Sequence, residues 1–337
     1  MTAGTAATGP GRGRRALVTG AGGFLGSQLC RRLVGDGWQV RAFVRYGAAG
    51  DIGGLHGLPE AATGSLDIRR GDLLDVEGVA RAVEGADTVF HLGARISIPY
   101  SYAAPRDTFQ VNALGTLNVL EAVRHGGVRR LVHTSTSEVF GSAVALPMAE
   151  THRLRAQSPY AASKIAADKL VESYVCAFGL PAVTLRPFNT YGPGQSPRAV
   201  IPAIVQQALA GGPVRLGALE PERDFTFVDD TVQAMILAAD AAAAVGCEIN
   251  LGTGEAIAIG ALARRIIALV GRPCTIELDA QRMRPPASEV DRLCSDNRRA
   301  AELLGWRPRV SLDEGLRRTI AWWRDGSPRF DWRGYAV

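Results

Sequence analysis

Cysteine, lysine and long hydrophobic runs are scarce in this chain of 337 residues. Its five cysteines are scattered without CxxC spacing, which argues against a disulfide framework or a metal site and for a reducing, cytoplasmic compartment. No run reaches the roughly 18 apolar residues of a membrane span. Residues 1–13 are rich in glycine, alanine and threonine but lack the apolar segment of a signal peptide, so we expect a flexible tail there.

Arginine supplies almost all of the positive charge. Lys164 and Lys169 are the only lysines among 38 basic residues, and the net charge is +5. Such a bias is typical of a GC-rich genome, and no basic cluster is interleaved with aromatic residues, so a nucleic-acid surface is not expected. A mildly basic chain still suits an anionic small ligand such as a diphosphate. The content of 47% hydrophobic and 21% charged residues is that of a globular protein.

Short apolar runs alternate with helical patterns over the first 190 residues. This order predicts βαβ units and an α/β fold with a Rossmann-type doubly wound parallel sheet, because continuous apolar strands need helices on both faces. The expected strands are residues 15–19, 39–44, 68–72, 88–92, 130–135 and 182–187, and the expected helices are residues 24–34, 76–83, 112–124 and 159–177.

Proline and glycine become frequent after residue 190, and the alternation stops. Residues 225–228 and 248–251 are expected to return to the sheet, with a helix over residues 231–244 between them. Further helices are expected over residues 260–270, 297–304 and 312–323. We therefore expect a main domain of residues 14–189 plus 225–254, and a smaller lobe of residues 190–224 plus 255–330.

A glycine-rich turn joins the first expected strand to the first expected helix. Gly20, Gly23 and Gly26 have the spacing G-x-x-G-x-x-G within the stretch GAGGFLG. Glycines at such a turn let the backbone approach a pyrophosphate, whose charge is stabilised at the helix N-terminus. The alternative is a tight turn whose glycines only pack the helix, but the position between strand and helix favours a dinucleotide site.

The end of the second strand bears on which dinucleotide binds. Val44 stands where an acidic residue would bond the adenosine ribose of NAD, and Arg45 follows it. Because arginine suits a 2′-phosphate, NADP is favoured over NAD, unless Arg45 only stacks on adenine or lies in solvent. Asp72, after the third strand, either accepts a hydrogen bond from the adenine amine or caps the next helix.

Two segments carry candidate catalytic residues. Tyr160 and Lys164 lie one turn apart on one helix face. A nearby ammonium and an oxidised nicotinamide both favour the phenolate, which can take a proton from a sugar hydroxyl. Thr136 and Glu138 follow a strand at the edge where open α/β sheets hold ligands. Thr136 can bond a substrate hydroxyl, and Glu138 either removes a second proton, as a dehydration requires, or caps the next segment.

The chain resembles an extended short-chain dehydrogenase/reductase of the NAD-dependent epimerase/dehydratase family over residues 15–325. The resemblance rests on GAGGFLGS (20–27), FHLGA (90–94), STSEVFG (135–141), YAASK (160–164), RPFNTYGP (186–193), RDFTFVDD (223–230) and RPPASEVDRL (284–293). Residues 91–102, 134–141 and 186–202 are most similar to nucleotide-sugar 4,6-dehydratases, in particular UDP-N-acetylglucosamine 4,6-dehydratases of the legionaminic-acid type. The strand VRAFVRY (40–46) is similar to that of NADP-using GDP-mannose 4,6-dehydratases.

The resemblance implies three groups of site residues and a homodimer through the helices over residues 112–124 and 159–177. The catalytic group is Thr136, Ser137, Glu138, Tyr160 and Lys164. NADP or NAD, bound by the main domain, would contact Gly20, Gly23, Phe24, Leu25, Gly26, Arg45, Asp72, Leu73, Leu92 and Ala94, together with Tyr160 and Lys164. A nucleotide-diphosphate hexose, bound partly by the smaller lobe, would contact Asn189, Arg223, Glu289 and Arg292.

Two positions depart from the pattern of the family. Ser137 stands where many dTDP-glucose 4,6-dehydratases have an aspartate that acts as the acid for the leaving water. Serine at this place is seen in the GDP-mannose branch and in UDP-glucuronate decarboxylases. Phe140 replaces the usual tyrosine. Departure of the C6 hydroxyl is therefore expected to depend on Glu138 or water.

The expected reaction is that of a nucleotide-sugar 4,6-dehydratase: oxidation at C4, loss of water across C5 and C6, and return of the hydride to C6. Three alternatives remain open. A C4 epimerase would leave Glu138 structural. A decarboxylase of a nucleotide-uronate shares the serine–glutamate pair and needs an extra arginine near C6. A catalytically idle NAD(P)-binding scaffold or redox sensor would need none of these side chains.

Overall fold

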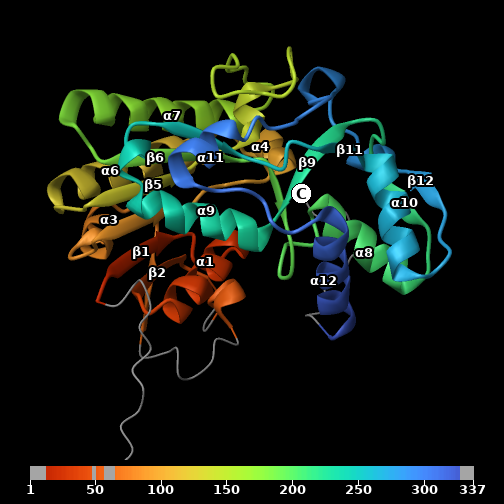
Figure 1. Cartoon of the computed structure of the whole chain (residues 1–337), viewed down its shortest axis with the longest axis horizontal. Helices are drawn as coiled ribbons and strands as arrows, with labels where there is room; N and C mark the ends of the chain where they lie inside the picture. The colour runs from red at the N-terminus through yellow and green to blue at the C-terminus, as the bar shows by residue number, and fades with distance from the viewer. Residues whose placement is uncertain (1–12, 48–50, 57–64, 327–337) are drawn as a thin grey trace, which may run out of the picture.

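The structure, a computed structural model of the chain, describes residues 13–47, 51–56 and 65–326. Within these ranges seven parallel strands form the main sheet, in the order β10-β6-β5-β4-β1-β2-β3 (Figure 1). They are β1 (Arg15–Thr19), β2 (Gln39–Arg45), β3 (Leu66–Gly71), β4 (Thr88–His91), β5 (Arg130–Thr134), β6 (Ala182–Pro187) and β10 (Glu248–Leu251). This order confirms the predicted Rossmann-type doubly wound sheet.

Helices cover both faces of this sheet because its strands are apolar on both sides. In β1, the side chain of Leu17 packs into one hydrophobic core, and those of Ala16 and Val18 pack into another. The first core lies under α3 (Val76–Val83), α6 (Gly115–His125) and α7 (Pro159–Phe178), and the second under α1 (Phe24–Gly35) and α9 (Val228–Asp240).

The segment between β4 and α6 is more helical than the sequence indicated. It contains α4 (Ile98–Ala103), α5 (Pro105–Phe109) and a π-helical turn, η2 (Gln110–Leu114), so the expected start of a helix at residue 112 is wrong. The Thr116 hydroxyl donates a 2.6 Å hydrogen bond to the Asn112 carbonyl, which holds this carbonyl within the widened turn. Single π-turns of this kind are frequent at functional sites.

The smaller lobe has sheets of its own. Strand β9 (Glu222–Phe227) pairs with β7 (Asn189–Tyr191) and β11 (Ala256–Ala258), so residues 225–228 do not return to the main sheet as expected. The reason is that residues 225–227 pair with Asn189–Tyr191 of β7, which lies outside the main sheet. Strand β10 does join the main sheet, beside β6. The domain boundaries stay a prediction.

Other elements complete the lobe and the loops. The strands β8 (Val214–Leu216) and β12 (Ile276–Leu278) pair with each other. The helices are α8 (Val200–Ala210), α10 (Ile259–Val270), α11 (Arg298–Leu304) and α12 (Leu312–Arg324), and the short 3₁₀ turns are η1 (Gly53–Leu55), η3 (Ser137–Phe140), η4 (Ala242–Ala244), η5 (Ala280–Arg282) and η6 (Pro286–Ser288).

Two of the expectations from the sequence can be compared with the structure only within the described residues. The tail predicted for residues 1–13 lies outside them, except for residue 13. Across the described ranges, none of the helices combines the length and the apolar character needed to cross a bilayer.

Candidate active site

The candidate site lies at the carboxyl ends of the main strands, around the point where the strand order reverses between β1 and β4. Open α/β sheets bind ligands at this switch point, because the two flanking loops diverge there. The residues predicted from sequence come to this edge from β1, β4, β5 and the start of α7.

The glycine turn after β1 fits a dinucleotide. Gly20 has a φ of +70°, and a Cβ there would lie 2.8 Å from the Gly93 nitrogen. A Cβ on Gly26 would collide with the Gly20 carbonyl. Gly23 precedes α1 and has no side chain that caps its first turn, so the N–H groups of Phe24 and Leu25 remain available to an anion. The turn therefore presents a close, positively polarised backbone cradle.

His91 fixes the loop after β4, which carries the predicted contacts Leu92 and Ala94. The Thr19 hydroxyl oxygen accepts hydrogen bonds from the Leu92 and Gly93 nitrogens at 3.1 and 3.0 Å, so its own proton goes to Nδ1 of His91 at 2.8 Å. The Thr116 hydroxyl donates its own proton to the Asn112 carbonyl, so its oxygen accepts a hydrogen bond from Nε2 of His91 at 3.0 Å. Burial holds the pKa of His91 well below its ordinary value, in agreement with a neutral ring.

The ends of β2 and β3 lie beside this cradle. Val44 is buried and Arg45 is exposed at the end of β2. Asp72 does not cap α3, since Asp75 does so by accepting from the Gly78 nitrogen at 3.0 Å. Its carboxylate instead accepts from the Leu74 nitrogen at 2.9 Å, which excludes the helix-cap alternative. The side chain of Leu73 is buried next to Gly93 and Gly115.

Tyr160, Lys164 and Thr136 come together as predicted. Ser158 caps α7, which leaves both catalytic candidates buried in its first turns, Tyr160 at 7% and Lys164 at 3% exposure. Nζ of Lys164 donates to the Thr134 carbonyl at 2.8 Å, at the end of β5. A side-chain hydrogen bond joins Thr136 to Tyr160.

Burial sets the protonation of this pair. It lowers the pKa of Lys164 to about 8, against the opposing effect of the Asp168 carboxylate. Burial also raises the pKa of Tyr160, and the charges of Glu138 and Asp168 add to this, while the hydrogen bond with Thr136 lowers it. At neutral pH Lys164 is thus an ammonium, and Tyr160 stays a neutral phenol until a positive charge arrives beside it.

Glu138 faces arginine and does not cap a helix. The cap of η3 is Thr136, whose hydroxyl oxygen accepts from the Glu138 nitrogen at 3.3 Å, so the capping alternative for Glu138 is wrong. The Glu138 side chain is 13% exposed, and its carboxylate lies 4.0 Å from Nη1 of Arg284. A carboxylate at this place can act as a base toward a ligand that lies over Tyr160.

Four side chains form what we call the acid–arginine cluster: Glu138, Arg223, Arg284 and Glu289. Glu289 accepts from Arg223 at 3.1 Å and lies 3.5 Å from Arg284. Burial lowers the pKa of Arg223, and the charges of Glu138 and Glu289 raise it again. The two guanidinium groups give the cluster donors that suit a diphosphate.

The side chain of Gln157 joins the segment that carries Arg284 and Glu289 to the catalytic loop, by which we mean residues 135–142 after β5. Its side-chain oxygen accepts from the Ser142 nitrogen at 2.6 Å, and its side-chain nitrogen donates to the Glu289 carbonyl at 2.9 Å. Tyr102, from α4, is hydrogen-bonded to Ser288 at 2.6 Å. The edge of the site is therefore assembled from three separate stretches of chain.

The other predicted residues lie at different depths. Oδ1 of Asn189 is buried without a hydrogen-bond partner among the described residues, as expected of a group that meets a ligand. Ser137 is buried beside Glu138. Arg292 instead pairs with Glu222 at 2.7 Å on the surface and is not part of the acid–arginine cluster.

Sequence reasoning missed Arg284 and Asn112. Arg284 opens the quoted motif RPPASEVDRL, but its approach to Glu138 is a contact between distant parts of the chain. Asn112 lies in the π-turn, where its side chain accepts from the Arg95 nitrogen at 2.6 Å and donates to the Ser163 hydroxyl at 2.9 Å. The stretch VNALGT, where a helix was expected to begin, was the available signal.

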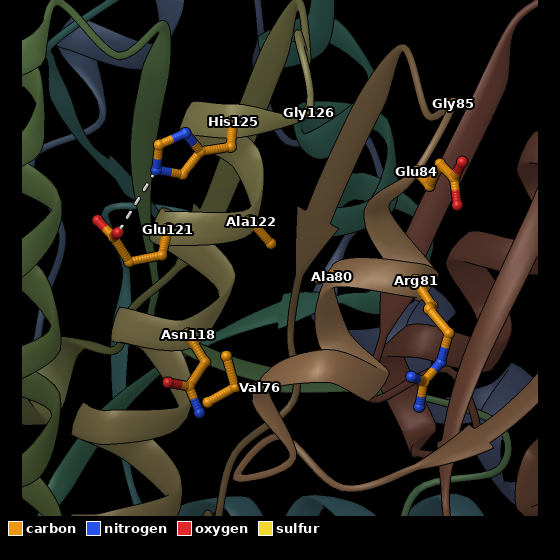
Figure 2. Close-up of a pocket in the computed structure, with 10 residues that line it drawn as sticks. All are labelled: Val76, Ala80, Arg81, Glu84, Gly85, Asn118, Glu121, Ala122, His125 and Gly126. Carbon is orange, nitrogen blue, oxygen red and sulfur yellow. Dashed lines mark ion pairs between the residues drawn. The ribbon is translucent and has the colours of Figure 1, made fainter.

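A separate groove with a volume of about 670 Å³ lies between α3 and α6. Figure 2 shows Arg81 and Glu84 on one wall and Asn118, Glu121 and His125 on the other. His125 faces Glu121 at 3.7 Å. None of the predicted site residues lines this groove, so it is not part of the candidate active site.

Comparison with known proteins agrees with this geometry. A family model described as GDP-mannose 4,6 dehydratase matches residues 17–319. The chain belongs to this family. It is 35% identical over 320 residues to the UDP-glucose 4-epimerase of Mycolicibacterium smegmatis, a match that covers 93% of this chain and 99% of the relative. The chain is thus an extended short-chain dehydrogenase/reductase among the nucleotide-sugar dehydratases and epimerases.

Two solved structures show what members of this family hold. DesIV from Streptomyces venezuelae, a dTDP-glucose 4,6-dehydratase with NAD bound, is similar with a TM-score of 0.84 and 30% identity over 92% of this chain and 97% of that one. MoeE5, in complex with UDP-glucuronic acid and NAD, has a TM-score of 0.82 and 34% identity over 92% and 99%. The family is therefore one of enzymes, and its members include both dehydratases and epimerases.

Proposed function

We propose that this enzyme is an NAD(P)-dependent nucleotide-sugar 4,6-dehydratase. The environment of the Glu138 carboxylate is the observation that supports this proposal most directly. The carboxylate caps no helix, is largely sheltered from solvent, and acts electrostatically on Tyr160. Two acid–base groups side by side are what the removal of two protons, from O4 and from C5, requires.

Tyr160 takes the proton of the C4 hydroxyl, with the Lys164 ammonium stabilising the phenolate and Thr136 hydrogen-bonded to it. Bound NAD(P)⁺ would supply the acceptor for the C4 hydride and the later donor of hydride to C6, and its positive charge would lower the phenol pKa. Glu138 removes the C5 proton, which the C4 ketone has made acidic. The C6 hydroxyl leaves as water after it takes a proton from the newly protonated Glu138 or from Ser137, and C5 takes up a proton from solvent when C6 receives the hydride.

The substrate in this proposal is a nucleotide-diphosphate hexose bound between the main domain and the smaller lobe. Arg223 and Arg284 bind the diphosphate through charge-assisted hydrogen bonds, and Asn189 uses its unpartnered oxygen on a substrate hydroxyl. The resemblance makes UDP-N-acetylglucosamine the first sugar to test. Glu289 positions both arginines through its ion pairs. Arg292, which lies outside the acid–arginine cluster, contributes to substrate binding from the edge of the site.

The proposed cofactor is NADP, with NAD as the alternative. Arg45 is exposed at the end of β2, where the adenosine ribose would lie, and Val44, Arg45 and Tyr46 place no acidic side chain there to repel a 2′-phosphate. Replacing Arg45 by alanine is expected to weaken NADP binding about 10–150-fold, since one charge-assisted contact is worth about 1.5–3 kcal/mol, and to leave NAD binding unchanged. Titration of the tryptophan fluorescence with each dinucleotide measures this, and equal weakening of both would exclude a 2′-phosphate contact.

We further propose a homodimer and a cytoplasmic location. Phe109, Leu114 and Phe178 are 46%, 43% and 51% exposed on α5, η2 and α7, an apolar surface that a second copy would cover. The five cysteines are free in the structure, as a reducing compartment allows. Light scattering on the purified protein tests the dimer.

A panel of UDP-, GDP-, dTDP- and CDP-hexoses tests the proposed reaction. The expected product has lost one water by mass spectrometry and, in D₂O, carries deuterium at C5. The Glu138→Gln variant should lose the dehydration and still allow partial reduction of bound cofactor. A product of unchanged mass would identify an epimerase instead, and absence of turnover on every sugar would favour an idle binding protein.

Decarboxylation of a nucleotide-uronate is the second candidate, because one observation favours it. Such an enzyme needs an arginine near C6 beside its serine–glutamate pair, and Arg284 lies 4.0 Å from Glu138. Adding UDP-glucuronic acid to the panel separates the two, since this reaction releases CO₂ and the proposed one releases water.

A further inference from the structure

A buried network lies behind the catalytic face of α7. We define it as Asp168, His133, Ser135, Arg186 and Glu248. Asp168 accepts hydrogen bonds from Ser135 at 2.7 Å, from Nε2 of His133 at 3.2 Å and from Arg186 at 3.2 Å. Arg186 continues to Glu248, whose side chain is 29% exposed. The network thus runs from the active-site helix through the sheet to the surface.

Asp168 is placed to act on the active site. It follows Lys164 by four positions, as Lys164 follows Tyr160, so the three side chains lie along one stripe of α7. Asp168 is 1% exposed. Despite burial, the hydrogen bond from His133 and the charges of Arg186 and Lys164 hold its pKa below the ordinary value, so it stays ionised.

The other groups around Lys164 do not supply a negative charge. His91 on β4 and His133 on β5 face Lys164, and burial holds both of their pKa values below the ordinary one, so they are neutral. Arg186 on β6 is positive, and Tyr160 is a neutral phenol. The Asp168 carboxylate is therefore the compensating charge for a buried ammonium.

We propose that Asp168 is a positioning residue whose carboxylate, one turn further along α7, keeps the buried Lys164 side chain charged beside Tyr160. The proposal rests on the role assigned to Lys164, which dehydration, epimerisation and decarboxylation share, and not on the choice between these reactions. Asp168 acts through Lys164 and touches no reacting atom.

The lysine content of the chain allows a direct test. Lys164 and Lys169 are the only lysines, so protein made with ¹³C,¹⁵N-lysine has two labelled side chains whose Cε and Nζ signals can be followed by NMR against pH without substrate. Lys169 is the internal control, because its side chain is 53% exposed and pairs with Glu172. We expect wild-type Lys164 to titrate near pH 8.

In Asp168→Asn, Lys164 should titrate at least about one pH unit lower, as expected when an opposite charge nearby is removed, while Lys169 stays in place. Asp168→Glu should restore most of the wild-type value. Ser135→Ala is the matched control, since it removes a hydrogen bond to the same carboxylate but no charge. An unchanged Lys164 in folded Asp168→Asn would overturn the proposal.

The double variant Asp168→Asn/Arg186→Met covers the case in which Asp168→Asn does not fold, because it leaves no unpaired charge at this pair. Removing Arg186 alone would raise the pKa of Lys164, so a lower value in the double variant can only come from the loss of Asp168. Failure of the double variant to fold would show that Asp168 serves the fold beyond its charge, and would also overturn the proposal. The nucleotide-sugar panel stays independent of this result, so failure of either idea can be told from failure of the other.

Discussion

Two groups of arginines and carboxylates adjoin the catalytic pair, and they differ in how tightly the carboxylate that acts on that pair is bonded. In the buried network, Asp168 accepts from three side chains at 2.7–3.2 Å. In the acid–arginine cluster, Arg284 lies 3.5 Å from Glu289 and 4.0 Å from Glu138. The same residue types therefore serve as fixed support around Asp168 and as a receptive surface around Glu138, although Arg223 and Glu289 within the cluster are also paired at 3.1 Å.

Burial explains this difference. The side chains of Asp168 and Arg186 have no exposed surface, so each charge must find its partner inside the protein. Arg284 and Glu138 are 27% and 13% exposed, so water or a ligand can complete their bonds. A ligand that brings phosphate charge would draw Arg284 and Arg223 away from the carboxylates and leave Glu138 free to act as a base.

The largest expected effect is on turnover, from Glu138→Gln in the acid–arginine cluster. The change keeps the size of the side chain and removes the base, so kcat for loss of water should fall by about 10²–10⁴-fold, with little change in stability. Glu222→Gln is the matched control, because Glu222 pairs with Arg292 outside the cluster. If Glu138→Gln turned over substrate within a few-fold of wild type, the acid–arginine cluster would not have the catalytic role that distinguishes it from the buried network.

Arg186→Met should produce the largest loss of stability. It leaves the Asp168 carboxylate buried without its strongest partner, which costs about 3–5 kcal/mol. Urea unfolding at pH 7 measures this, and adding Asp168→Asn should recover part of the loss. A change below about 1 kcal/mol would mean that the buried network does not support the fold.

Lys164 gives a pH dependence of stability with a definite sign. Its folded pKa of about 8 lies below the ordinary value of 10.5, so between these pH values the unfolded chain binds more protons and stability rises with pH, by up to about 1.4 kcal/mol per pH unit. Below pH 8 the penalty for the buried ammonium is fully present. Urea unfolding of the wild type and Lys164→Met over this range should show the extra slope only in the wild type, and equal slopes would contradict it.

The smallest expected effect belongs to Arg292. Its pair with Glu222 is on the surface, with Arg292 55% exposed, so Arg292→Ala should change stability by about 0–1 kcal/mol. Arg223→Ala, in the acid–arginine cluster, should instead raise KM for the nucleotide sugar strongly. If Arg292→Ala raised KM as much as Arg223→Ala, Arg292 would have to be counted among the substrate-binding residues of the acid–arginine cluster.

The sequence predicted what depends on neighbours in the chain. The glycine turn and the spacing of Tyr160 and Lys164 are local, and the structure places both at one sheet edge. The doubly wound parallel sheet followed from the alternation of strands and helices. Local pattern was enough here because each feature needs only a few consecutive residues.

Contacts between distant segments could not be predicted in this way. Arg284 reaches Glu138 only because Gln157 ties its loop to the catalytic loop. Residues 225–228 have the composition of a buried strand, but their partners in β7 and β11 follow from the packing of the lobe. Residue 112 was wrong as the start of a helix, because the turns of α5 and η2 that precede it are held by packing against α7.

The π-turn at residues 110–114 also makes the chain sensitive to its length at that point. One residue corresponds to about 100° of helix rotation. Deleting any one residue of this turn would restore a regular helix and swing α5 around α6, carrying the amide of Asn112 away from Arg95 and Ser163. Members of this family should therefore accept substitutions in this stretch far more readily than single-residue insertions or deletions.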